Sequence, residues 1–198
     1  MRKFFGGWIF WLAVLPLAGC GHGALQEQDE ALRTAWADMT HECRQRVDLL
    51  PSLLSIVARH SDDQSAQILA VNAARDRALQ IATGPGLLDD AVAFADFQAA
   101  QSGLSDAVTT MLAATVTDAE LQSDADFRDL RAQLEVLERD IAQARDRYRV
   151  AVKAYNATVN DFPTNLTAGM FDYEEKPQVV GPGDSALGSS PAPQAASL

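Results

Sequence analysis

The segment SDADFRDLRAQLEVLERDIAQARDRYRVAVKAYNATVNDF, residues 123–162, carries the clearest periodic pattern in the chain. Its apolar residues recur at steps of three and four without a slip, which predicts a helix with one buried face. Ser123 precedes the pattern and is predicted to cap the helix. About 36 residues rising 1.5 Å each form a rod of roughly 54 Å, and such a rod cannot bury its apolar stripe alone. The stripe consists of Phe127, Leu130, Leu134, Leu137, Ile141, Ala144, Tyr148, Ala151, Tyr155, Thr158 and Phe162.

Three further segments show helical spacing and predict the partners of this rod. They cover residues 24–59, 62–82 and 88–117, and Pro51 is expected to bend the first, because an internal proline removes a helix hydrogen bond. Alternating strand patterns with hairpin turns are absent from the sequence. We therefore predict an all-α fold, an antiparallel up-and-down bundle of about four long helices over residues 24–176. A dimeric coiled coil is the alternative use of the stripe.

The N-terminus has the composition of an export signal. Two basic residues precede an apolar run that ends in Leu17-Ala18-Gly19-Cys20. This ending resembles a bacterial lipobox, so we predict a signal peptide over residues 1–19, cleavage before Cys20 and acylation of the Cys20 thiol, which would attach the protein to a membrane. Residues 20–28 are then a short polar tether. The alternative is an uncleaved signal anchor. Both alternatives predict a bundle on the extracytoplasmic side of a bacterial cell envelope.

Composition narrows the classes of partner and chemistry. Lys and Arg number 16 against 27 Asp and Glu, a net charge of −11, which disfavours binding to nucleic acid. His41 and Cys43 lie two residues apart on a predicted helix, a poor spacing for a shared metal ion, and no metal, phosphate-loop or nucleophile motif occurs. We expect no cofactor, no metal and no enzymatic activity. From Gly181 the chain reads GPGDSALGSSPAPQAASL, and residues 177–198 are predicted to form a disordered tail.

Two stretches carry a family resemblance. AWADMTHECRQRVDLLPSLLSIV (35–57) and RDIAQARDRYRVAVKAYNATVNDFPTNLTAGMF (139–171) together resemble the LemA family, which pairs an AW…RxDLxPxL helix with a later R…Y…V…YN…FPxN helix. The resemblance implies a bundle of long helices tethered at its N-terminus to a bacterial membrane, with the bundle outside the cytoplasm. It implies no enzyme activity. The sequence departs from the family where a Tyr-Pro pair commonly precedes the last helix and where Arg149, rather than Asn, follows Tyr148.

The residues that carry the resemblance have physical roles of their own. A half-buried Arg46 needs an anionic partner, either Asp48 or a carboxylate from another helix. Pro163 forbids helical geometry at Phe162 and ends the last helix, and Asn165 is suited to cap the next turn. Packing and helix termination are the first interpretation, and contact with a partner is the second. The candidate structural or interaction residues are Trp36, Arg46, Asp48, Pro51, Arg145, Tyr148, Tyr155, Asn156, Phe162, Pro163 and Asn165.

These observations favour a membrane-tethered helical scaffold or adaptor that binds another envelope protein through an exposed face of its bundle. Outward-facing residues near Pro51 and at the corner formed by residues 162–171 are the candidate contacts. The competing hypothesis is a structural protein whose long helices associate with one another and organise or shape the membrane. A carrier of an apolar ligand between the helices is a third hypothesis.

Overall fold

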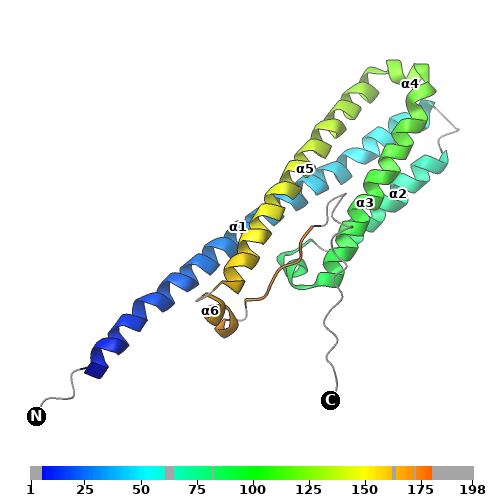
Figure 1. Cartoon of the computed structure of the whole chain (residues 1–198). Coiled ribbons are helices and arrows are strands. Elements are labelled where there is room, and N and C mark those ends of the chain that lie inside the picture. The colour runs from blue at the N-terminus through cyan, green and yellow to red at the C-terminus, as the bar shows by residue number, and fades with distance from the viewer. Residues whose placement is uncertain (1–5, 61–64, 82, 162–163, 172, 180–198) are drawn as a thin grey trace, which may run out of the picture.

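The computed structural model describes residues 6–60, 65–81, 83–161, 164–171 and 173–179, and this part of the chain is helical without a strand (Figure 1). The four long helices are α1 (Gly6–His60), α2 (Ser65–Gln80), α3 (Ala91–Ala114) and α5 (Ala125–Asn160). Short helices join or follow them: two 3-10 helices, Pro85–Asp89 and Thr115–Thr117, and two α-helices, α4 (Ala119–Ser123) and α6 (Thr164–Met170).

The long helices form an antiparallel bundle made of two pairs. α1 packs most extensively against α5, and α2 packs against α3, while α1 and α2 connect the pairs (Figure 1). The all-α bundle predicted from the apolar spacing is therefore confirmed. Its core consists of two apolar clusters, one at the end where α6 lies, around Trp36 and Tyr148, and the other toward the α4 end, around Leu50 and Phe127.

Aspartates define where the later helices begin. Asp90, Asp118 and Asp124 each precede a helix, and their carboxylates accept hydrogen bonds from backbone N–H groups of the first turn. The prediction that Ser123 caps the last long helix was wrong by one residue: Ser123 ends α4, and Asp124 accepts from the N–H of Phe127 at 2.9 Å.

The first helix is longer than predicted. α1 starts at Gly6 rather than near residue 24, so residues 20–28 are a part of α1 and not a separate tether. The buried stripe of α1 begins at Leu25, which lies in the core cluster together with Ala168 of α6. No helix in the described ranges is both long enough and apolar enough to cross a membrane.

Pro51 does not interrupt α1, because a neighbouring helix compensates for its missing N–H group. In an α-helix the N–H of residue 51 would donate to the carbonyl oxygen of Val47. Here the Nε of Arg75 on α2 donates to that oxygen at 3.1 Å. The proline thus creates a free acceptor inside the bundle, and this acceptor connects α1 to α2.

A strap, residues 173–179, returns from α6 across the seam between α5 and α3 (Figure 1). Its backbone is held by α5 and α3, and Val179 is buried in the core cluster of Trp36. The tail predicted for residues 177–198 therefore begins too early, since residues 177–179 are packed on the bundle. Residues 180–198 lie outside the described residues.

Candidate functional site

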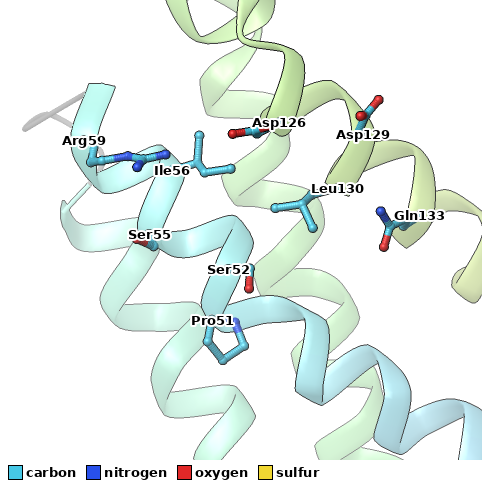
Figure 2. A pocket seen from close by; sticks show the side chains of 9 residues that line it. All are labelled: Pro51, Ser52, Ser55, Ile56, Arg59, Asp126, Asp129, Leu130 and Gln133. Atoms are coloured by element: carbon cyan, nitrogen blue, oxygen red, sulfur yellow. The ribbon is translucent and has the colours of Figure 1, made fainter.

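A groove runs between α1 and α5, and every residue that lines it belongs to one of these two helices. It has three open sections of about 630, 630 and 730 Å³. Figure 2 shows the first section, where Ile56 and Leu130 point toward one another between the helices. From the α4 end to the α6 end, the sections pair α1 residues 51–59 with α5 residues 126–133, then 42–49 with 133–140, and then 28–35 with 143–154.

The groove keeps a constant direction because its lining repeats every seven residues. Val136 and Val150 of α5 lie two heptads apart, with Gln143 between them, and all three line the groove. A heptad repeat places side chains on one line along a helix that packs against another helix. The groove therefore follows the α1–α5 pair along its length.

The groove combines an apolar floor with an acidic rim. In the middle section the apolar lining residues are Leu49, Val136 and Leu137, which we call the floor, and none of the described lining residues is a cation. Val136 is 45 % exposed and Val150 is 71 % exposed. The described lining of the three sections contains six carboxylates and two arginines, so the groove is acidic. The carboxylates are those of Glu42, Asp48, Asp126, Asp129, Asp140 and Asp146, and the arginines are Arg59 and Arg147.

Arg46 lies in the interior of the bundle, points to α3 and α5, and is only 1 % exposed. One terminal nitrogen donates to Ser105 Oγ at 2.6 Å and forms an ion pair with Glu138 at 2.9 Å. The other donates to Gln101 Oε1 at 2.6 Å. The partner of Arg46 is therefore a carboxylate of another helix, the second of the two predicted alternatives. Asp48 is exposed and pairs with Arg44 at 3.3 Å.

Trp36 anchors the α6 end of the core. Its ring lies 5.1 Å from Phe97, 5.6 Å from Phe94 and 5.6 Å from Tyr148, measured between centroids. Its indole N–H donates to the carbonyl oxygen of Thr83 at 3.1 Å, which satisfies the polar atom of an otherwise apolar side chain. Trp36 thus joins α1, α3, α5 and the loop after α2.

Tyr148 and Asn156 hold the strap. The Tyr148 hydroxyl donates to the carbonyl oxygen of Pro177 at 2.8 Å. The Asn156 amide donates to the carbonyl oxygen of Lys176 and accepts from its N–H, both at 2.9 Å. The ammonium group of Lys176 in turn pairs with Asp89. Tyr155 is fully buried nearby, and its hydroxyl has no hydrogen-bond partner among the described residues.

The remaining predicted residues are dispersed. Pro51 is exposed and lines the first section of the groove. Arg145 is half-buried and close enough to Cys43 for its charge to act on the thiol. Asn165 is exposed and lies inside α6, donating its N–H to Asp161, so it does not cap that helix as predicted. Phe162, Pro163 and the side chain of Cys20 lie outside what the structure describes.

The described residues were also searched for a group of side chains that could bind a metal ion. Within the described ranges, no group of three or more His, Cys, Asp and Glu side chains is placed to hold a metal ion. Cys43 is buried and forms no disulfide, and burial raises the pKa of its thiol.

A comparison with models of protein families supports the resemblance carried by the two quoted stretches. The model of the LemA family matches residues 35–185, which includes both stretches quoted above. This chain belongs to the LemA family. A search of curated proteins returned no match.

In this LemA-family bundle most of the motif residues are internal. Trp36, Arg46, Tyr148 and Asn156 fix the helices and the strap, whereas the groove is lined mainly by residues outside the motifs. Sequence reasoning missed the groove because the α1–α5 pairing must be known first. Two apolar residues outside the buried stripe were the available sign. Val136 and Val150 lie two heptads apart and do not belong to the stripe.

Removal of the counter-ion of Arg46 is expected to destabilise the bundle. In Glu138→Ala the buried guanidinium keeps only neutral acceptors. Because the Glu138 side chain is itself 39 % exposed, we expect the free energy of unfolding to fall by about 2–3 kcal/mol, less than for a fully buried pair. The double variant Arg46→Met/Glu138→Ala should lose less, because no unpaired charge is left in the core. Urea unfolding followed by far-UV circular dichroism measures both.

Glu135→Ala is the matched control for this experiment, because Glu135 forms an exposed pair with Arg131 on the same helix. Its effect should stay within about 0.5 kcal/mol. Equal losses from Glu138→Ala and Glu135→Ala would contradict the role of Glu138.

The two buried tyrosines are expected to respond differently to loss of the hydroxyl. Tyr148→Phe removes the hydrogen bond to Pro177 and should cost about 1 kcal/mol. Tyr155→Phe removes a hydroxyl without a partner among the described residues and should be neutral or stabilising. Urea midpoints at pH 7 compare them, and equal losses would show that the Tyr155 hydroxyl is bonded.

The same tyrosines predict a loss of stability in alkali. Burial raises the pKa of Tyr155 to about 12 and also raises that of Tyr148. The unfolded value is about 10, so the stabilisation is complete below pH ~10 and declines as the pH rises toward the folded value, by up to about 1.4 kcal/mol per pH unit for each tyrosine. Tyr155→Phe should reduce this slope; an unchanged slope between pH 9 and 11.5 would refute the assignment.

Proposed function

We propose that this LemA-family protein is a non-enzymatic scaffold of the bacterial cell envelope, anchored in a membrane through acylated Cys20 and exposing its bundle on the extracytoplasmic side. The lipobox-like sequence Leu17-Ala18-Gly19-Cys20 supports the anchor. The scaffold binds a second envelope protein through the α1–α5 groove. The observation that carries this function is the apolar floor of the groove, open along both helices.

The chemistry of the groove favours a basic amphipathic helix as the bound segment. An amphipathic helix docks into a groove through apolar residues spaced by three and four, which matches a floor that repeats every seven residues. The rim supplies carboxylates on both sides, so Lys and Arg next to the apolar residues of the partner would be attracted.

Self-association is the second candidate function, and the heptad spacing of the groove favours it. The charge opposes it, since two chains of net charge −11 repel each other and the groove itself is acidic. A carrier of an apolar ligand has less support. The partly open pocket beside Cys43 measures only about 100 Å³, whereas ligand cavities usually exceed about 300 Å³.

The anchor is tested by Cys20→Ala. The variant should lose the acyl mass and move from the membrane fraction to the soluble fraction or remain as an unprocessed precursor, because the acylated thiol holds the mature chain. Intact mass spectrometry and detergent phase partitioning measure this, with Cys43→Ala as the control that keeps the anchor. If the wild-type chain carries no acyl group and retains residues 1–19, the uncleaved anchor is correct instead.

The groove is tested by a charge on its floor. Val136→Glu should reduce recovery of the partner from cross-linked, detergent-solubilised membranes by about tenfold or more, because a carboxylate would be buried in the contact. Val92→Glu is the matched control, since Val92 is 75 % exposed on α3 and does not line the groove. Both variants should keep the wild-type circular dichroism.

Three outcomes of this experiment separate the hypotheses. A second protein that is lost only with Val136→Glu supports the scaffold. Equal recovery with both variants refutes the groove as the binding surface. Recovery of this chain alone, cross-linked to itself, favours the self-associating structural protein.

A further inference from the structure

The helix α6 exposes an apolar face at one end of the bundle. Leu166 and Met170, one helical turn apart, are 66 % and 77 % exposed, and Phe171 directly follows them with half of its side chain exposed. Ala168, on the opposite side of α6, is buried in the core. The helix therefore packs on the bundle with one side and presents large apolar groups on the other.

This face lies next to the predicted membrane anchor. Ala168 shares a core cluster with Leu25 of α1, and Cys20 precedes Leu25 by five residues in the same continuous helix. Five residues correspond to about 7.5 Å along the helix axis. Figure 1 shows α6 beside the stretch of α1 that leads to the N-terminus, at the end of the bundle opposite α4.

We propose that the exposed face of α6 is a second membrane contact, in which Leu166 and Met170 enter the boundary between headgroups and acyl chains. This inference rests on the proposed anchoring of the N-terminus. It holds equally for acylated Cys20 and for an uncleaved anchor, since both bring the bilayer to the same end of α1. A rigid helical link of this length keeps α6 close to the lipid surface instead of letting the bundle move away from it.

The contact is apolar and not electrostatic. Among the described residues, the exposed charged side chains nearest in sequence are Asp161, Glu174 and Glu175, all acidic. Anionic headgroups would repel these carboxylates, whereas zwitterionic lipids would not. The proposal therefore commits to insertion of apolar side chains, and it predicts a weaker contact on a phosphatidylglycerol-rich surface than on phosphatidylcholine.

The test uses the full anchored chain reconstituted into phosphatidylcholine vesicles that contain brominated lipid. A fluorophore sensitive to its environment is attached at Met170→Cys in a Cys43→Ala background, and the matched control is Val116→Cys. Val116 is 64 % exposed in the 3-10 helix Thr115–Thr117, next to α4 at the opposite end. We expect quenching by the brominated lipid to be several-fold stronger at position 170 than at position 116.

Flotation of the vesicles tests the anchoring of the N-terminus separately from the α6 contact. If the chain floats and position 170 is quenched no more than position 116, the α6 contact is refuted while the anchor stands. If the chain does not float, the anchoring and the α6 contact are refuted together. A label at Leu166→Cys repeats the measurement one turn away, so a local perturbation at position 170 cannot decide the result.

Discussion

The buried guanidinium of Arg46 is the constraint on which the arrangement of the helices depends. It lies between the two apolar clusters of the core and donates to Gln101 and Ser105 of α3 and to Glu138 of α5. Apolar contacts tolerate a shift of one helix along another, but a buried cation tolerates only the position where its acceptors are. Arg46 therefore fixes the relative heights of α1, α3 and α5 at once.

Large groups inside the bundle explain why the seam between α3 and α5 is filled while the outer face of the α1–α5 pair is open. α3 and α5 stay further apart than the close pair α1–α5, and their seam is filled by the Arg46 cluster, the rings around Trp36 and the strap. The strap is thus a structural part of this seam and not a free tail. On the outside of the close pair no comparable element of the described residues covers the helices, and the apolar lining with Val136 stays open there.

The helices were predicted well from the sequence, and the hydrogen bonds and ion pairs between them were predicted poorly. Apolar spacing depends only on one helix, so six of the nine residues predicted for the stripe between Phe127 and Tyr155 are buried, while Leu130, Leu137 and Ala151 are only half-buried and the buried Val152 was not predicted. The partner of Arg46, by contrast, depends on which helices pair. The ordered strap was missed because a stretch containing Pro177 has no helical or strand pattern, and its order comes from the side chains of Tyr148 and Asn156, 20 and more residues away in the chain. The hydrogen bond from Arg75 to the Val47 carbonyl oxygen was not predicted, because the sequence does not show which residue of another helix lies next to the carbonyl that Pro51 leaves free.

The continuity of α1 through Pro51 gives the molecule a defined height above the proposed anchor. From Cys20 to His60 the helix rises about 60 Å, since each residue adds 1.5 Å. The groove begins near Gln28 and reaches Arg59, so with the proposed anchor a helix seated in it would extend from close to the lipid surface to the far end of the bundle. A helix broken at Pro51 would lose this property, because the distal section of the groove would no longer be aligned with the proximal one. Arg75 thereby supports the proposed binding surface without lining it, by satisfying the one carbonyl that Pro51 leaves free.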